Sequence, residues 1–179
     1  MIASFGSYYL DSIQEKDAWK ICDFVVANED RLKQFFPQTL SQNLNPSLAK
    51  AFAQKKTRQF LLNEEFVFLL KENESRNLVG IIYIKELDWK QKQGEFAYCI
   101  GYQFEGKGLI SKSIEALSKY SFEHLNLKTL QIIVHKSNKP SIKVATNNKF
   151  TWKETLLEEY TPPNSLPLDM ELYELHYER

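Results

Sequence analysis

Two glycines separated by one lysine, Gly106-Lys107-Gly108, stand where this sequence is best suited to bind a ligand. They follow an apolar run at 96–100, which is typical of a strand, and precede a segment whose apolar residues recur at helical spacing. A helix that starts directly after a strand leaves several backbone N–H groups without acceptors, and glycine lets a ligand approach them closely. Such a turn receives phosphate. The stretch 93–125 therefore predicts a site for a phosphate-bearing ligand.

A nucleotide-binding P-loop is one interpretation of this turn. Gly101-x-x-x-x-Gly106-Lys107 begins that motif correctly, but Gly108 stands where a Ser or Thr hydroxyl should hold magnesium. The apolar run 129–135 ends in His135 instead of an acidic residue, so the charge of phosphoryl transfer would go unneutralised. A second interpretation is a tight turn with no ligand, because many strand–helix turns contain glycine.

A third interpretation rests on a family. Residues 95–108, EFAYCIGYQFEGKG, resemble the acetyl-CoA-binding motif of the GNAT acyltransferase superfamily, and particularly its RimJ/RimL branch, which acetylates the N-terminal amines of ribosomal proteins. The usual core is Gln/Arg-x-x-Gly-x-Gly/Ala, and residues 105–110 (EGKGLI) fit that register. A second block, Asn138-Lys139-Pro140-Ser141 after a strand at 129–135, resembles the strand, N-x-x-S and helix of the family. The resemblance spans nearly the whole chain.

Three positions depart from the pattern of the family. Glu105 replaces the usual Gln or Arg and places a carboxylate next to the expected diphosphate site. Lys149 stands where a glycine normally ends the second helix, at a position that often requires positive φ. Ala145 occupies the place where many GNAT enzymes carry a tyrosine general acid, although RimJ/RimL-like members commonly lack it.

The resemblance implies how acetyl-CoA would bind. Strands at 95–103 and 129–135 would run parallel and splay apart, with pantetheine paired to the open strand edge. A backbone N–H near Gln103 would polarise the thioester carbonyl, and Lys107 or Lys112 would add charge at the diphosphate. Asn138 would contact the cofactor or only cap its helix. The predicted cofactor-binding residues are Ile100, Tyr102, Gln103, Phe104, Gly106, Lys107, Gly108, Leu109, Ile110, Ser111, Asn138 and Ser141.

The same resemblance implies direct transfer of the acetyl group to a primary amine, which needs a base for the amine and a proton donor for the thiolate. Ser141 is the candidate donor, or else a capping serine. Glu95 is the first candidate for the base and Glu86 the second, and for either the alternative is a solvated carboxylate at a strand end. His135 is a further candidate for mutation. A catalytically silent acyl-CoA-binding protein of the same fold is the alternative function.

The elements that must hold these residues follow from the pattern along the chain. We expect strands at 5–13, 65–72, 78–87, 95–103, 129–135, 150–157 and 168–177. We expect helices at 16–28, 29–36, 46–63, 109–125 and 139–148. About seven strands and four or five helices predict one α+β domain over 1–179, with a mixed central sheet. Aromatic residues at 19–36 and 88–89 would shape the acceptor pocket, although Trp19 is expected to pack in the core.

Bulk composition narrows the class of protein. Lys+Arg and Asp+Glu both number 23, so no overall basic field argues for binding nucleic acid. Cys22 and Cys99 form no spaced pair, which indicates buried, reduced thiols in a cytoplasmic protein. No apolar run approaches the length of a membrane span, and no signal peptide or metal-binding cluster is recognisable. The partner would be an amine, either a protein N-terminus or a small molecule, and the strand-rich C-terminal end could form a homodimer.

Overall fold

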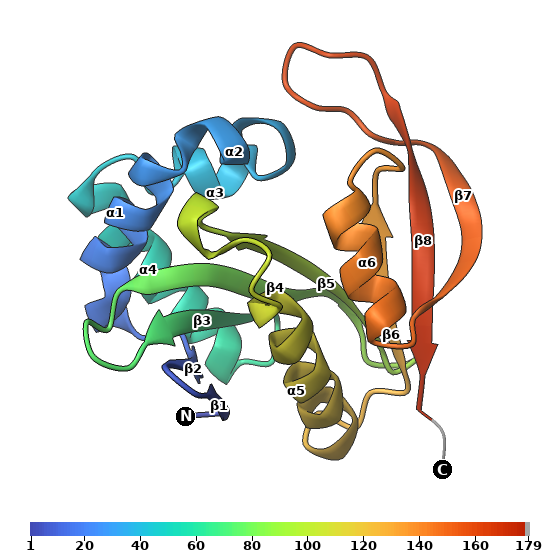
Figure 1. The fold of residues 1–179 in the computed structure, drawn as a ribbon, viewed down its shortest axis with the longest axis horizontal. Coiled ribbons are helices and arrows are strands. Elements are labelled where there is room, and N and C mark those ends of the chain that lie inside the picture. Colours follow the sequence, from blue (N-terminus) through green and yellow to red (C-terminus); the bar gives the residue numbers. More distant parts are fainter. Residues whose placement is uncertain (178–179) are drawn as a thin grey trace. The chain divides into compact units, whose positions relative to one another are not determined.

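The computed structural model describes residues 1–177, which contain eight strands and six α-helices. The strands are β1 (Ala3–Phe5), β2 (Tyr8–Ser12), β3 (Phe66–Glu72), β4 (Leu78–Asp88), β5 (Gln93–Ile100), β6 (Thr129–Val134), β7 (Thr151–Tyr160) and β8 (Leu168–His176). The helices are α1 (Ala18–Ala27), α2 (Glu29–Phe35), α3 (Pro37–Ser41), α4 (Pro46–Leu61), α5 (Leu109–Glu123) and α6 (Lys139–Asn147), with 3-10 turns η1 (Glu15–Asp17) and η2 (Tyr102–Phe104). The strands follow the order β1-β2-β3-β4-β5-β6-β8-β7 in one sheet (Figure 1).

Two compact units divide the chain, and each has its own core. The first unit contains residues 1–83 and 98–107. In it, every residue of β3 from Phe66 to Lys71 is buried, which is typical of a strand covered on both faces. The ring of Phe60 on α4 meets Phe66 and Phe68 edge-on, with centroids 4.9 and 5.4 Å apart. These contacts hold α4 on β3.

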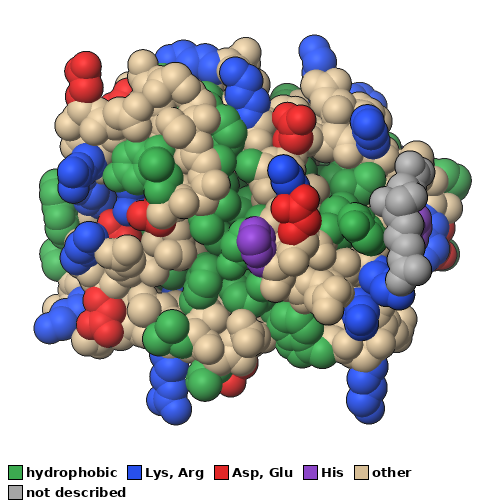
Figure 2. All heavy atoms as spheres, turned by 90° about the horizontal axis from the view of Figure 1, so that it is seen from below, with side chains coloured by type: hydrophobic (Ala, Val, Ile, Leu, Met, Phe, Trp, Pro, Cys, Tyr) green, Lys and Arg blue, Asp and Glu red, His purple; other side chains and the backbone are tan. Residues whose placement is uncertain are grey.

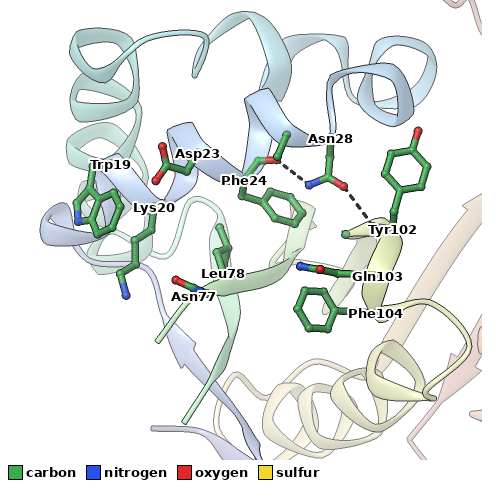
Figure 3. Close-up of a pocket in the computed structure, with 12 residues that line it drawn as sticks. Trp19, Lys20, Asp23, Phe24, Asn28, Asn77, Leu78, Tyr102, Gln103 and Phe104 are labelled. Carbon is green, nitrogen blue, oxygen red and sulfur yellow. Dashed lines mark hydrogen bonds between the residues drawn. The ribbon is translucent and has the colours of Figure 1, made fainter. Parts of the chain in front are cut away.

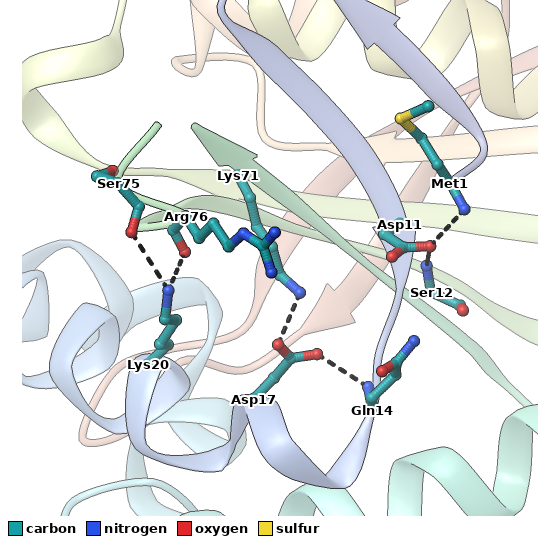
Figure 4. Close-up of polar contacts among 9 residues, drawn as sticks. All are labelled: Met1, Asp11, Ser12, Gln14, Asp17, Lys20, Lys71, Ser75 and Arg76. Carbon is teal, nitrogen blue, oxygen red and sulfur yellow. Dashed lines mark hydrogen bonds and ion pairs between the residues drawn. The ribbon is translucent and has the colours of Figure 1, made fainter. Parts of the chain in front are cut away.

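A buried ion pair fixes the start of α1 in the same unit. Lys71 Nζ lies 2.7 Å from Asp17 Oδ1, and both side chains are 6% exposed. The other oxygen of Asp17 accepts from the Gln14 N–H at 3.0 Å. Lys20 Nζ donates to the Arg76 carbonyl at 2.5 Å, at the tip of the β3–β4 connection (Figure 4). Because a buried charge that loses its partner is costly, these contacts hold α1 in one position.

The second unit contains residues 84–97 and the described residues from 108 onward. Its strand β6 alternates between half-buried and buried positions, with Leu130, Ile132 and Val134 inward. β8 pairs with all of β6 through its residues 171–176, and it carries β7 on its other side as an antiparallel partner. α5 buries Ile110, Ile114 and Leu117, the helical stripe expected from the sequence. This unit therefore fixes the direction in which α5 begins.

Most predicted elements are confirmed, but the first strand and a short helix are corrected. The expected strand 5–13 is a hairpin, because Gly6 adopts φ +64 and the chain turns between β1 and β2. Pro37 ends α2, as predicted, but also opens α3, which the sequence did not indicate. Proline suits the first turn of a helix since its missing N–H would have no acceptor there. The described chain thus has one strand and one helix more than the sequence predicts.

The predicted strand at 95–103 is also too long. β5 ends at Ile100, and residues 102–104 form the 3-10 turn η2. Strand alternation therefore does not extend from β5 to Gln103. The parallel pairing of β5 with β6 is confirmed over Gln93–Phe96 and Thr129–Ile132. The splaying of these strands beyond that stretch stays a prediction, as does the single domain.

Surface charge agrees with the balanced composition. On the face in Figure 2, Lys and Arg side chains are scattered among Asp, Glu and hydrophobic side chains. Such a surface gives no strong field of either sign to steer a charged partner. Within residues 1–177, none of the helices is both long and apolar enough to cross a membrane. Cys22 and Cys99 are free; Cys22 is buried, whereas Cys99 is only half-buried.

Candidate functional site

The end of β5 is anchored before the glycine turn begins. The Gly101 N–H donates to the Val79 carbonyl at 2.9 Å, and the Phe104 N–H donates to the Gly101 carbonyl at 3.0 Å. Phe104 is 7% exposed, and its ring meets Tyr8 edge-on with centroids 6.1 Å apart. η2 is therefore a fixed turn, and the residues after it start from a defined position.

Asn28, at the end of α1, holds the same turn. Its side-chain Nδ2 donates to the Phe24 carbonyl at 2.8 Å, and its Oδ1 accepts from the Tyr102 N–H at 3.2 Å (Figure 3). The N–H groups of Gly101, Tyr102 and Phe104 are thus all used internally. Of the backbone donors predicted to bind pantetheine in this turn, Gln103 is the one whose N–H has no acceptor among residues 1–177.

The two glycines adopt backbone conformations that other residues rarely reach. Gly106 has φ +72 and Gly108 has φ +70, and a Cβ built on either would meet no atom within 4 Å. Internal packing therefore does not require glycine here; the left-handed backbone does, and the space beside both residues is open. This is the geometry of a turn that a ligand can approach closely.

The start of α5 is open as well. Gly108 precedes the helix, and no side chain caps it. Among the described residues, no acceptor is found for the N–H groups of residues 106–111, and the first N–H with a partner at this end is that of Lys112, which donates to the Gly108 carbonyl at 3.1 Å. Leu109 and Ile110 are 4% and 7% exposed, so their side chains hold this end of the helix in the core. A fixed helix start with unsatisfied donors suits an anion.

Glu105 is compensated by a residue that sequence reasoning missed. Its carboxylate forms an ion pair with the guanidinium of Arg31 on α2, and that guanidinium also lies 4.5 Å from the ring centroid of Tyr102. The hydrogen bond with Arg31 lowers the pKa of Glu105, and the same bond raises the pKa of Arg31. No local signal points to this pair, because 74 residues separate its members.

Of the predicted basic residues, Lys107 lies in the turn itself, and Lys112 follows with Ser111 in the first turn of α5. Lys107 and Lys112 are both exposed, and Lys107 Nζ lies 5.1 Å from the ring centroid of Phe104. The Ser111 hydroxyl accepts from Asn148 Nδ2 at 3.0 Å, which ties the first turn of α5 to the end of α6. Ser111 therefore contributes to packing through its side chain and to the open helix start through its N–H.

Asn138 caps α6. Capping was one of the two roles predicted for this residue, and contact with the cofactor was the other. Its Oδ1 accepts from the Ser141 N–H at 3.2 Å. His135 Nδ1 lies 2.7 Å from the Ser137 hydroxyl.

The other end of α6 carries two of the departures from the family pattern. Lys149 has φ +64, the positive φ that the family's glycine at this position led us to expect. Ala145 is fully buried and its carbonyl accepts from the Phe150 N–H at 3.0 Å, so this position belongs to the core.

The two candidate bases lie in different environments. The side chain of Glu95 is 12% exposed and its Oε1 lies 3.0 Å from Lys85 Nζ. Burial raises the pKa of Glu95, and Lys85 opposes that shift. Glu86 is exposed and holds φ +48 on β4. A partly desolvated carboxylate with a raised pKa is better suited to accept a proton, so Glu95 is the stronger candidate.

A pocket of about 490 Å³ opens beside η2, within the first unit. Trp19, Lys20 and Asp23 of α1 line it on one side and Gly101 to Phe104 on the other (Figure 3). Trp19 is 56% exposed, so the prediction that it packs in the core is wrong. Trp89, the other predicted aromatic, is 44% exposed and does not line this pocket.

The arrangement as a whole defines a class of protein: a mixed α/β fold in which an open helix start follows a strand and a glycine turn. The profile of the acetyltransferase (GNAT) domain family matches residues 8–151. The chain belongs to the GNAT acetyltransferase family. This membership decides against the P-loop hypothesis for Gly101–Gly108.

Curated relatives carry acetyltransferase names. The chain is 30% identical over 136 residues to the "Putative ribosomal N-acetyltransferase YdaF" of Bacillus subtilis, covering 72% of this chain and 69% of that protein. It is 29% identical over 110 residues to the "Uncharacterized N-acetyltransferase p20" of Bacillus licheniformis, covering 62% of this chain and 60% of that protein. It is 28% identical over 81 residues to a spermidine N(1)-acetyltransferase of Escherichia coli, covering 45% and 44%.

Solved structures share the fold over almost the whole chain. The ribosomal-protein-S5-alanine acetyltransferase of Vibrio fischeri superposes with a TM-score of 0.91 at 18% identity, covering 97% of this chain and 95% of that one. RimL, a ribosomal L7/L12 α-N-protein acetyltransferase in complex with coenzyme A, superposes with a TM-score of 0.88 at 18% identity, covering 98% and 97%. These similarities confirm the GNAT-like fold expected from the sequence.

Proposed function

We propose that this protein transfers the acetyl group of acetyl-CoA directly to a primary amine. The observation that carries the proposal is the open start of α5, where the N–H groups of residues 106–111 have no acceptor among residues 1–177. The left-handed Gly106 and Gly108 leave the space beside them free. A diphosphate supplies the negative charge that such a helix start favours.

Three groups of residues would bind acetyl-CoA. The N–H groups from Gly106 to Ile110 would hold the diphosphate, and the exposed Lys107 and Lys112 would add positive charge. The backbone from Ile100 to Phe104 would lie along the pantetheine arm, with the Gln103 N–H directed at the thioester carbonyl. When bound, acetyl-CoA supplies an acyl group activated as a thioester.

The acid–base steps would fall to Glu95 and Ser141. Glu95 would take the proton from the ammonium form of the acceptor, directly or through water, which frees the lone pair of its nitrogen. Burial raises the pKa of Glu95, which brings it closer to that of the amine than an ordinary carboxylate, and the neighbouring Lys85 opposes that shift. Ser141 would return a proton to the thiolate; its own N–H is already held by Asn138.

The acceptor would be a protein N-terminus or a small amine. The B. subtilis relative is named for ribosomal N-acetylation and the E. coli relative for spermidine, and both groups of acceptor are primary amines. The exposed Trp19 and the carboxylate of Asp23 line one pocket. Asp23 offers a negative charge to a cationic amine, whereas Lys20 Nζ already lies 5.6 Å from the ring centroid of Trp19.

The test is thiol release from acetyl-CoA in the presence of an amine panel. The panel should contain peptides with free and blocked N-termini, spermidine and single amino acids, and mass spectrometry should identify the acetylated nitrogen. Thiol release that depends on one class of amine supports the proposal. Saturable CoA binding without release for any amine would favour the catalytically silent alternative, and absence of CoA binding would contradict the proposal itself.

A further inference from the structure

The open helix start has an unfavourable neighbour in the sequence. Glu105 comes directly before Gly106, and its side chain is 47% exposed. An ionised carboxylate at this position repels a diphosphate held by the next amides. The basic side chains nearest in the sequence, Lys107 and Lys112, are exposed and make no ion pair with Glu105. The compensation therefore has to come from elsewhere in the chain.

Arg31 on α2 compensates the charge of Glu105. Its Nη2 pairs with Glu105 Oε1, and its guanidinium lies over the ring of Tyr102, 4.5 Å from the centroid. Arg31 is the more protected partner, with 24% of its side chain exposed. One side chain thus touches both ends of the segment 102–105, which leads directly into the glycine turn. The three residues lie in the same compact unit.

We infer that Arg31 is a positioning residue for the diphosphate of coenzyme A. It neutralises Glu105, so that the carboxylate does not oppose the anion, and it holds η2 through Tyr102, so that the amides from Gly106 onward stay aligned. The usual family motif carries Gln or Arg at the position of Glu105; here the positive charge comes from a different helix. This inference rests on the proposed function, because it requires a diphosphate at the start of α5.

The charges beside the turn indicate how substitutions of Arg31 and Glu105 should change the affinity for CoA. With Arg31 present, the three charged side chains beside the turn in the same compact unit, Arg31, Glu105 and Lys107, sum to one positive charge. Arg31→Gln reduces the sum to zero and leaves the Glu105 carboxylate unpaired. We expect this variant to bind CoA about tenfold more weakly, which corresponds to about 1.4 kcal/mol. Glu105→Gln removes the repulsion, so it should bind CoA as tightly as the wild type or more tightly.

The test is a double-mutant cycle read by isothermal titration with CoA. Wild type, Arg31→Gln, Glu105→Gln and the double variant are compared, with Lys33→Gln as the matched control. Lys33 lies on the same helix, and its ion pairs are with Asp30 at 2.8 Å and Glu29 at 3.6 Å, both on α2. The expected result is a tenfold loss for Arg31→Gln, recovery to within about threefold of wild type in the double variant, and no change for the control. Thermal unfolding of each variant identifies any that fails to fold.

Each outcome separates this inference from the proposed function. If wild type binds CoA and Arg31→Gln binds equally well, the inference is wrong and the proposed function stands. If the double variant stays as weak as Arg31→Gln, Arg31 does not act through Glu105, and the inference is again wrong. If wild type itself shows no affinity for CoA, the proposed function fails first. In an activity assay the Arg31 effect should appear in KM for acetyl-CoA and leave kcat unchanged.

Discussion

α5 and α6 begin in opposite ways, although each follows a strand of the same sheet. α6 starts with a side-chain cap, since Asn138 accepts from the Ser141 N–H, and it has a proline in its first turn. α5 starts at a left-handed glycine with no side-chain cap. Glycine in place of a capping Asn typically costs a helix only about a few tenths of a kcal/mol, so α5 forgoes a little stability that α6 has. The α6 start is completed by the protein itself, and under the proposed function a ligand would complete the α5 start.

The largest effect on activity should come from Glu95 and not from either helix start. The α5 start would bind the cofactor and the α6 start is structural, so the acid–base chemistry depends on Glu95. We expect Glu95→Gln to lower kcat by roughly 10²–10³-fold, the usual contribution of a positioned general base. KM for acetyl-CoA should stay unchanged. Glu86→Gln is the matched control, because Glu86 is also a strand glutamate but is exposed. A smaller kcat loss for Glu95→Gln than for Glu86→Gln would transfer the role to Glu86.

Gly108→Ala tests the open helix start itself. The new methyl group would occupy the free space beside the amides, so CoA affinity should fall by a factor on the order of 10². Part of any effect is backbone strain, about 1–2 kcal/mol of stability for a side chain at positive φ. Gly6→Ala is the matched control, because Gly6 has φ +64 and equally open surroundings in the β1–β2 turn. Both variants should melt at lower temperature, and Gly108→Ala alone should lose CoA in a titration.

Removing Lys85 should shift the pH dependence of the reaction. Burial raises the pKa of Glu95 and Lys85 opposes that shift, so Lys85→Met should raise the pKa further. Because the base must be deprotonated, the acid limb of kcat/KM should move to higher pH, and activity should fall most at the acid end of the profile. Lys85→Arg retains the charge and should leave the limb close to its wild-type position. A limb that moves to lower pH in Lys85→Met would exclude Glu95 as the group that titrates.

Asn138→Ala should produce the smallest change in binding. Loss of the cap should cost about 1 kcal/mol of stability, which lowers Tm by about 2–4 °C for a chain of this size. CoA affinity should change by less than about threefold, far less than for Gly108→Ala, because the cap amide of α6 is already satisfied. Asn138→Asp keeps a capping oxygen and should restore Tm. A tenfold loss of CoA affinity in Asn138→Ala would show that the two helix starts share the ligand.

Local patterns predicted the elements around the site well. The apolar run before Gly101, the glycine pair and the helical stripe through Ile114 each specify structure within a few residues, and β5 and α5 both formed, although β5 ends at Ile100 and not at residue 103. The positive φ of Lys149 was also predicted, because a helix end imposes it locally. The hairpin at Gly6 and the helix at Pro37 were missed, since glycine and proline signal a break in an element without specifying the type of the next element.

Contacts between distant segments could not be predicted in the same way. Glu105 was recognised as unusual, yet Arg31 and Asn28 lie 74 residues away from their partners in and beside η2, and nothing in their local sequence marks them. Trp19 sits in a helical apolar pattern, but the fold leaves its ring exposed at a pocket. Periodicity identifies the apolar side of a helix; it does not show where that side extends beyond the core.

Amide NMR during a CoA titration tests whether the backbone amides at the start of α5 bind the diphosphate of coenzyme A. The N–H resonances of Gly106, Gly108, Leu109 and Ile110 should shift saturably with CoA, because these groups gain acceptors. The Ser141 N–H, already bonded to Asn138, should shift much less. CoA binding that leaves the resonances of residues 106–110 in place would contradict a diphosphate site at this helix start.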